Sequence, residues 1–181
     1  MNKSQLRKKI LKIRKNNFNK NFKINTNNFI SFLKINMNNI NTLGGYYPSN
    51  HEINDLEILD LLKKKNFKIS LPVIRKNNQM DFFKWSKNDP LKINKYGIPE
   101  PISSKIFYPD ILLIPLVGYD NHLNRLGYGG GFYDRYIEKI EKIKKVIKIG
   151  LAFSYQRLKS VPINQNDKKL DFIITENEIL K

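Results

Sequence analysis

A glycine-rich segment flanked by two arginines is the part of this sequence best suited to chemistry. Residues 125–135 read Arg-Leu-Gly-Tyr-Gly-Gly-Gly-Phe-Tyr-Asp-Arg and precede a predicted helix. Glycines let backbone N–H groups approach a phosphate closely, and a helix start adds unpaired N–H groups and a partial positive charge. Arg125 and Arg135 offer guanidinium forks that suit phosphate oxygens. Asp134 is a hard oxygen ligand of the kind magnesium prefers, so the segment predicts a site for ATP phosphates and magnesium.

The glycines alone are a weak signal, because a flexible turn explains them equally well. The segment is not a P-loop, since no Gly-Lys-Ser/Thr follows the glycines. It is not a dinucleotide-binding fingerprint either, because Phe132 stands where the third glycine should be. The two arginines and the aspartate are what favour phosphate binding.

Helical patterns alternate with short apolar runs along the chain. Strand 40–47 is weakened by Gly44 and Gly45, and Ser4 lies near the cap of the first helix. Helices are predicted over residues 4–16, 26–35, 54–65 and 130–145. Strands are predicted over 40–47, 67–74, 79–85, 111–116, 146–153 and 170–175, and a proline-punctuated loop over 89–109.

This alternation predicts an α/β fold, a three-layer α/β/α sandwich with a mostly parallel central sheet. In such folds ligands bind at the carboxyl ends of the strands. The glycine-rich loop follows the apolar run 111–116, and further segments follow Phe153 and Tyr47. We therefore expect these three segments to meet at one rim.

The composition is that of a globular protein with no cysteine, which excludes disulfides, cysteine nucleophiles and thiolate zinc sites. The longest apolar run, 111–118, is far shorter than the ~20 residues of a membrane helix. Residues 1–15 are basic and lack the apolar block of a secretory signal. An organellar presequence is one interpretation, but we favour an amphipathic helix with Leu6, Ile10 and Ile13 on one face. The chain is thus predicted to be cytoplasmic, with no membrane partner.

The formal net charge is +17, which raises the possibility of nucleic-acid binding. However, the basic residues are nearly all lysine, and asparagine and isoleucine are also frequent, which is what an AT-rich coding sequence produces. We therefore attribute most of the charge to codon bias and expect no nucleic-acid partner. The remainder could attract polyanions such as ATP or a polyglutamate tail.

Residues 125–135 closely resemble the signature of the 5-formyltetrahydrofolate cyclo-ligases, also called methenyltetrahydrofolate synthetases. Each other matching piece is weak, but their order and spacing together are strong. These pieces are residues 3–7, 46–52, 71–73, 80–82, 97–101, 110–115, 150–153 with Gln156, and 170–175. One departure is Leu123, which stands where the family usually has a turn glycine. Asn121 or Asn124 is expected to take the left-handed position instead.

The resemblance implies a single cyclo-ligase domain over residues 1–181, acting as a monomer. It implies an enzyme that uses ATP and magnesium to convert 5-formyltetrahydrofolate to 5,10-methenyltetrahydrofolate, with ADP and phosphate as the other products. It assigns catalysis to Arg125 and Tyr128, and magnesium binding to Asp134 and Asp171. ATP would be bound by Lys3, Arg7, Arg125, Leu126, Gly127, Tyr128, Gly129, Gly130, Gly131, Phe132 and Tyr133. The folate would be bound by Tyr47, Glu52, Tyr96, Tyr128, Gly129, Gly130, Gly131 and Phe132.

Simpler interpretations remain open for several of these residues. Lys3 and Arg7 suit an ordinary solvated helix face, and Glu52 suits a charge in the first turn of the next helix. Asp171 could be an ordinary residue at a strand start, and Tyr47 and Tyr96 could belong to the core. For the whole chain, the alternatives are a basic RNA-binding module and a sugar-phosphate isomerase or transferase, which would not need ATP.

Overall fold

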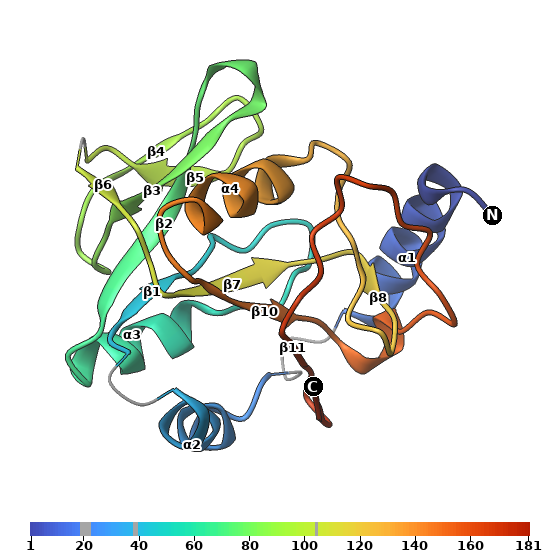
Figure 1. Ribbon diagram of the computed structural model, residues 1–181, viewed down its shortest axis with the longest axis horizontal. Coiled ribbons are helices and arrows are strands. Elements are labelled where there is room, and N and C mark those ends of the chain that lie inside the picture. Colours follow the sequence, from blue (N-terminus) through green and yellow to red (C-terminus); the bar gives the residue numbers. More distant parts are fainter. Residues whose placement is uncertain (19–22, 38–39, 104) are drawn as a thin grey trace.

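The structure is a computed structural model that describes residues 1–18, 23–37, 40–103 and 105–181. Within them a central sheet has the strand order β12-β11-β10-β7-β1-β2-β3-β6 (Figure 1). The five neighbouring strands from β11 to β2 are parallel, and β12, β3 and β6 join antiparallel at the edges. The strand bounds are β1 Thr42–Gly44, β2 Lys68–Ile74, β3 Met80–Lys84, β6 Ile106–Phe107, β7 Ile111–Pro115, β10 Ile147–Leu151, β11 Phe172–Ile174 and β12 Ile179–Leu180.

The central strand β7 is apolar because both of its faces are covered. Ile111 and Leu113 belong to one core cluster, whereas Leu112 and Ile114 belong to another on the opposite face. Successive side chains of a strand point to opposite faces, so one short apolar run serves two cores.

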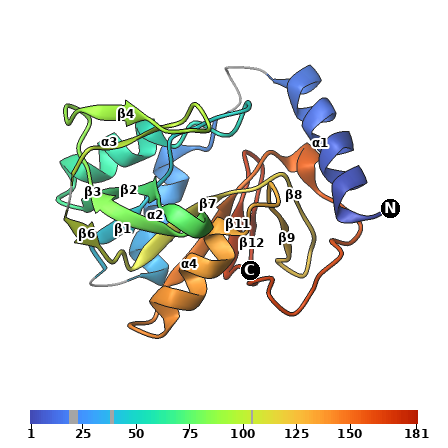
Figure 2. The same ribbon diagram turned by 90° about the horizontal axis from the view of Figure 1, so that it is seen from above.

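Helices cover both faces of the sheet. Helix α2 (Thr26–Asn36) and helix α3 (Leu56–Lys64) pack on the first face, and α4 (Phe132–Glu141) packs on the second. Helix α1 (Lys3–Asn17) lies beside the short hairpin of β8 (Gly118–Tyr119) and β9 (Arg125–Leu126), as both ribbon views show (Figures 1 and 2). The structure therefore confirms the predicted α/β fold with a mostly parallel central sheet between helices.

The apolar face of α1 is also confirmed. Ile10 is buried in a third cluster, and Leu6 and Ile13 pack against it. The cap differs from the prediction, because Asn2 rather than Ser4 accepts the hydrogen bond and Gln5 completes the capping box. No helix in the described part of the chain is long and apolar enough to cross a membrane.

The predicted loop 89–109 is wrong, because it contains the hairpin of β4 (Leu91–Ile93) and β5 (Pro99–Pro101) as well as β6. The turn between them is closed by Asn94, whose side chain accepts from Tyr96 N and Ile98 N, and by Gly97 at φ 76°. Pro99 and Pro101 lie in a two-stranded hairpin, where a missing N–H costs little.

The left-handed turn before the signature is a second correction. Neither Asn121 nor Asn124 takes that conformation; Leu123 itself does, at φ 63°. Asp120 folds the turn by accepting from His122 N and from the backbone and side chain of Asn124. Leu123 is 7% exposed and packs in the α4-side core, so burial holds a leucine in a strained position.

Other boundaries shift less. The helix predicted over 130–145 spans only Phe132–Glu141, after Gly131 at φ 66°, and the helix predicted over 54–65 begins at Leu56. The strand predicted over 40–47 is reduced to β1: Gly45 N still donates to Ser70 O of β2, but Tyr46 N donates to the Asp55 side chain instead of a neighbouring strand.

Candidate functional site

The carboxyl ends of β1, β7 and β10 lie side by side, since these parallel strands are neighbours in the sheet. In Figure 1 the arrow of β7 points toward β8 and α1. The segments that follow these strands therefore share one rim, as the sequence predicted.

Arg7 closes α1 onto the glycine-rich loop. Its Nε donates to Gly127 O at 2.7 Å. Gly129 has φ 104°, and a Cβ there would lie 3.3 Å from Arg7 Cζ. The loop thus uses glycine both for its backbone conformation and for the close approach of the guanidinium.

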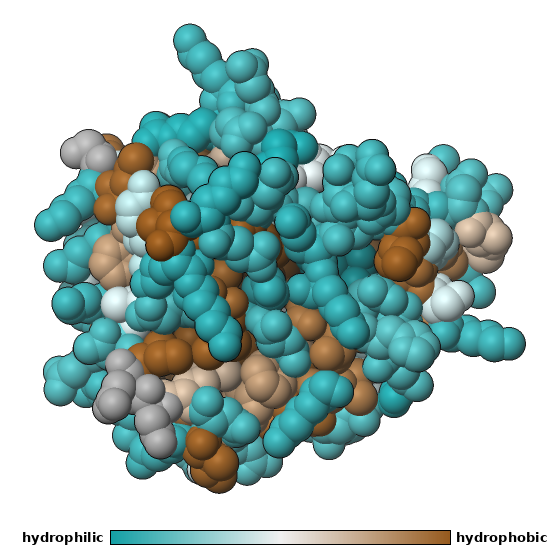
Figure 3. All heavy atoms as spheres, viewed as in Figure 1, coloured by the Kyte–Doolittle hydropathy of each residue, from teal (hydrophilic) through white to brown (hydrophobic). Residues whose placement is uncertain are grey.

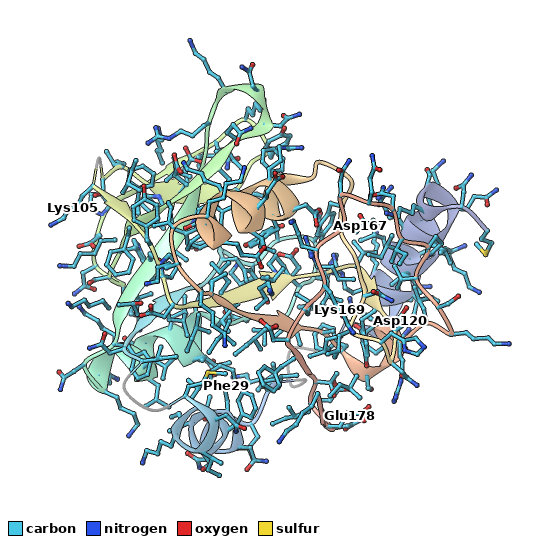
Figure 4. The ribbon with its side chains drawn as sticks, viewed as in Figure 1. Phe29, Lys105, Asp120, Asp167, Lys169 and Glu178 are labelled. Atoms are coloured by element: carbon cyan, nitrogen blue, oxygen red, sulfur yellow. The ribbon has the colours of Figure 1, made fainter. Side chains whose placement is uncertain are left out.

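Lys3, one helical turn earlier, contacts a different segment. Its Nζ lies 2.5 Å from Asp167 Oδ2. Asp167 is labelled in Figure 4 on the C-terminal segment next to α1. Lys3 and Arg7 therefore fasten α1 to the two segments that border the rim.

Arg125 is buried and bonds to two separate segments of the chain. Its side chain is only 5% exposed; Nη2 donates to Asp134 Oδ1 at 2.6 Å and Nη1 donates to Lys168 O. Asp134 Oδ1 also accepts from Lys168 N at 3.0 Å. Arg125 thus ties the first turn of α4 to the segment that leads into β11.

Arg135 braces the loop from the other side. Its guanidinium donates to Asn78 O at 2.7 Å and to Gly130 O. The two arginines that flank the signature therefore both donate to acceptors within the protein.

Glu52 lies at the rim, at the end of a tight turn. Asn50 and His51 both have positive φ, and Glu52 N donates back to Ser49 O at 2.9 Å. The carboxylate accepts from Ser49 N at 2.8 Å and is 8% exposed. Because α3 begins only at Leu56, Glu52 is not a first-turn helix charge.

Glu52 lies near Tyr128 of the glycine-rich loop, and the hydroxyl and the carboxylate interact electrostatically. Burial raises the pKa of Glu52, whereas bonds from Ser49 and Tyr128 and the charge of Arg14 lower it. Burial and the nearby Glu52 also raise the pKa of Tyr128, so its hydroxyl stays protonated. This juxtaposition joins two segments that are far apart in the sequence.

Arg14, for which the sequence predicted no role, is 1% exposed. Its Nη1 donates to Leu116 O at 3.2 Å, and its Nη2 donates to the Tyr128 hydroxyl. One signal was available: Arg14 lies seven residues after Arg7, on the apolar stripe of α1 that also carries Ile10.

Several polar atoms near this cluster have no hydrogen-bond partner within the described residues. They are Arg14 Nε, Asp55 Oδ1, Tyr133 Oη and Tyr155 Oη. Burial raises the pKa of Asp55 and that of Tyr133 well above their usual ranges. Buried polar atoms are normally satisfied, so these atoms suit a polar ligand at the rim.

The two other predicted aromatic residues differ in position. Tyr96 is 51% exposed and meets Phe132 edge-on, with ring centroids 5.8 Å apart. The β4–β5 turn therefore reaches the start of α4. Tyr47 is half-buried and packs against the core beneath α2 and α3.

The two predicted magnesium ligands lie in different settings. Asp134 stands in the first turn of α4, with Oδ1 held as described above. Asp171 precedes β11 at its amino end, and its Oδ2 accepts from Lys148 N at 2.8 Å. Among the described residues, no three carboxylates or histidines gather into a metal site.

A separate hollow of about 370 Å³ lies under α2, away from the rim. Its lining is mostly apolar, and Figure 3 shows hydrophobic atoms between α2 and the sheet on an otherwise mainly hydrophilic face. Its lining contains no carboxylate, no histidine and no part of the glycine-rich loop.

Comparisons with known proteins agree on one family. A family model described as the 5-formyltetrahydrofolate cyclo-ligase family matches residues 1–176. The 5-formyltetrahydrofolate cyclo-ligase of Haemophilus influenzae is 33% identical over 132 residues, covering 69% of this chain and 70% of the relative. A probable 5-formyltetrahydrofolate cyclo-ligase of Schizosaccharomyces pombe is 29% identical over 146 residues, covering 72% of each.

Solved structures agree as well. The NMR structure of Aquifex aeolicus 5,10-methenyltetrahydrofolate synthetase superposes with a TM-score of 0.78 at 28% identity, covering 99% of this chain and 92% of that one. The synthetase from Mycoplasma pneumoniae gives a TM-score of 0.72 at 26% identity, covering 97% and 99%.

Proposed function

The chain belongs to the 5-formyltetrahydrofolate cyclo-ligase family, and from that premise we propose that the rim around the glycine-rich loop is its active site. The enzyme converts 5-formyltetrahydrofolate to 5,10-methenyltetrahydrofolate and, as the family implies, uses ATP. The observation that carries the proposal is the meeting of Glu52, Tyr128 and Arg14 beside a glycine loop that Arg7 and Arg135 hold in place.

The reaction needs an activated oxygen. A formamide oxygen is a poor leaving group, so the γ-phosphoryl group of ATP is transferred to the formyl oxygen of the folate, and ADP departs. The neighbouring bridge nitrogen then attacks the formyl carbon, the C–O bond breaks, and phosphate leaves as the ring closes. The protein's task is to position both substrates and to neutralise phosphate charge.

The ATP half of the proposed site consists of α1 and the glycine-rich loop. Backbone N–H groups between Leu126 and Tyr133 would cradle the phosphates at the start of α4. Lys3 and Arg7 would add positive charge from α1, and Arg125 would keep the loop anchored to α4. Support comes from the contact between Arg7 and the loop, which brings these elements within one hydrogen bond of each other.

The folate half consists of Glu52 and the aromatic residues around the loop. A carboxylate accepts well from the adjacent N–H donors of an aminopyrimidine edge. Glu52 would bind that edge, and Tyr128, Phe132, Tyr96 and Tyr47 would line the flat ring system. The burial of Glu52 favours this role, because a buried acceptor gains more from a ligand donor than an exposed one.

Magnesium would be held by Asp134 and phosphate oxygens. Asp134 fits a single-carboxylate ligand, since only its Oδ1 is engaged by Arg125 and Lys168, and magnesium usually combines one or two carboxylates with substrate phosphates. The ion supplies charge neutralisation at the phosphates when bound. Asp171 stays a predicted second ligand, which would have to leave its bond to Lys148 N.

We further expect the chain to act as a single domain and a monomer in the cytoplasm, without a nucleic-acid or membrane partner. The part of the positive charge that codon bias does not explain would then attract ATP and folate anions.

The test is a rate measurement. Purified protein should form methenyltetrahydrofolate, followed by its ultraviolet absorbance, only when ATP and magnesium are both present. Equal rates without ATP would exclude the ATP-dependent ligase reaction. Equal rates with a metal chelator would exclude the magnesium requirement alone.

A further inference from the structure

Arg14 is a buried charge that makes few hydrogen bonds to the rest of the fold. Burying a guanidinium is costly unless its N–H groups are well used. Within the described residues, Nε has no partner, and the contact of Nη1 is a single carbonyl, Leu116 O. Gln156 Nε2 already donates to that same carbonyl at 2.9 Å. The backbone at the end of β7 is therefore satisfied without Arg14.

The remaining contact of Arg14 leads into the site. Its Nη2 donates to the oxygen of the Tyr128 hydroxyl, so the hydroxyl hydrogen stays available for another acceptor. Glu52 is the carboxylate that lies near this hydroxyl. Arg14 of α1, Tyr128 of the glycine-rich loop and Glu52 of the turn before α3 therefore lie in sequence, and the last of them is a carboxylate.

We propose that Arg14 is a positioning residue for the ligase reaction, which directs the Tyr128 hydroxyl at Glu52 and keeps Glu52 a carboxylate for the N–H donors of the folate. The inference rests on the proposed function, since it names the residue that prepares the folate half of that site. Arg14 acts through Tyr128 and Glu52 and needs no contact with either substrate.

The electrostatic surroundings of Glu52 make this testable through pH. Ser49 donates to it, the charge of Arg14 and the hydroxyl of Tyr128 act on it, and Asp55, Tyr46 and Tyr133 are the other titratable groups nearby. Burial already raises the pKa of Glu52. Removing Arg14 removes an opposing influence, so this pKa rises further, and folate binding that needs the carboxylate fails at a higher pH than in the wild type.

The experiment compares Arg14→Met and Arg14→Lys, each alone and combined with Tyr128→Phe. Lys12→Met, which removes an exposed cation from the same helix, is the matched control. For each protein, kcat/KM for 5-formyltetrahydrofolate is measured across the pH range at saturating ATP. Thermal unfolding with and without ATP verifies that each variant is folded and binds nucleotide.

We expect Arg14→Met to lower kcat/KM about tenfold or more and to move the acidic limb of the profile to higher pH. Arg14→Lys should keep the position of the limb but lose part of the rate, because a lysine lacks the guanidinium fork. When Tyr128 is already replaced by Phe, Arg14→Met should lower kcat/KM much less, since Arg14 acts through the Tyr128 hydroxyl. Lys12→Met should behave like the wild type.

An unshifted acidic limb together with additive losses would overturn the inference and make Arg14 a plain anchor of α1. If Arg14→Met does not fold, the Arg14→Lys and Tyr128→Phe pair still decides: additive losses overturn the inference and non-additive losses support it. A wild-type protein that forms no methenyltetrahydrofolate would contradict the proposed function itself. The two failures are therefore distinguishable.

Discussion

At the residue scale, the cations of the rim act first on the protein itself. Lys3 forms an ion pair with Asp167, and Arg125 forms one with Asp134. Arg7 donates to Gly127 O, Arg125 to Lys168 O, and Arg135 to Gly130 O. Each of these bonds fixes a segment that borders the glycine-rich loop. The cations therefore shape the proposed phosphate-binding backbone, and we expect them to supply charge to it as well.

Arg125 should have a measurable effect on both stability and rate. Arg125→Ala leaves Asp134 without its charged partner, so we expect a loss of about 1.5–3 kcal/mol in the free energy of unfolding. Turnover should fall by a factor of about 100 or more, the range for removed electrostatic stabilisers. Arg125→Lys should restore part of each.

Urea unfolding and steady-state kinetics, run at a temperature where each variant is folded, separate the two effects. An Arg125→Ala protein that is less stable yet fully active would show that Arg125 contributes to stability but not to the reaction rate.

The two acidic residues should differ in their dependence on magnesium. Asp134→Asn should raise the magnesium concentration that gives half-maximal rate at least about tenfold, because a carboxylate ligand is lost. Asp171→Asn should raise it less, since its carboxylate is bound to Lys148 N in this structure. Magnesium titrations of the initial rate at fixed ATP make the comparison, and an equal or larger rise for Asp171→Asn would restore it as a full ligand.

At the element scale, the sequence predicted what local pattern dictates. The apolar run of β7, the glycine-rich loop and the amphipathic face of α1 all follow from residue types at fixed spacing. The β4–β5 hairpin did not, because the Asn94 side chain rather than the sequence pattern closes its turn. Arg14 was missed because its place on the apolar stripe of α1 is a weak signal, and its partners come from the end of β7 and the glycine-rich loop.

The positive φ of Leu123 belongs to this scale as well. No residue pattern predicts a leucine there, because a left-handed backbone costs a side chain with a Cβ about 1–2 kcal/mol. Burial in the α4-side core contributes about 1.5–3 kcal/mol in return. The free energy gained by burying Leu123 is therefore larger than the cost of its left-handed backbone, and burial determines the conformation of the turn.

Glycine and alanine variants at Leu123 should reverse the usual order of stability. Both lose the buried side chain, but alanine keeps the left-handed strain and glycine does not. We expect Leu123→Gly to be about 1 kcal/mol more stable than Leu123→Ala. At Leu170, which is buried in the same cluster without a positive φ, alanine should be the more stable of the two. Urea unfolding measures all four, and the same order at both positions would contradict the strain.

At the scale of the whole molecule, α1 links the chain's beginning to its end. Lys3 contacts Asp167 and Arg7 contacts the glycine-rich loop, although more than 100 residues separate each pair. The site is thus assembled from segments spread over the chain, which explains why no single motif identified it completely. The order of several short motifs carried that information.

The net charge of +17 is also a property of the whole molecule. If it reflects composition rather than a nucleic-acid partner, the protein should not retain single-stranded RNA in a gel-shift assay at physiological salt. Binding that appears only at low salt is the expected behaviour of scattered lysines. A retained, salt-resistant complex would favour the RNA-binding alternative.

The central claim is that Glu52 binds the folate beside a separate phosphate-binding loop. Burial raises the folded-state pKa of Glu52 above its unfolded value, so the carboxylate lowers stability as pH rises through that window. Glu52→Gln removes this cost, and we expect its free energy of unfolding at neutral pH to be no lower than that of the wild type. Folate affinity should nevertheless fall.

Calorimetric titration of wild type and Glu52→Gln with 5-formyltetrahydrofolate and, separately, with ATP tests this most directly. Losing a charged acceptor for buried N–H donors should cost about 1.5–3 kcal/mol, which is about 10- to 150-fold in the dissociation constant for folate. The dissociation constant for ATP should stay near that of the wild type. Unchanged folate affinity in a folded variant would contradict the account.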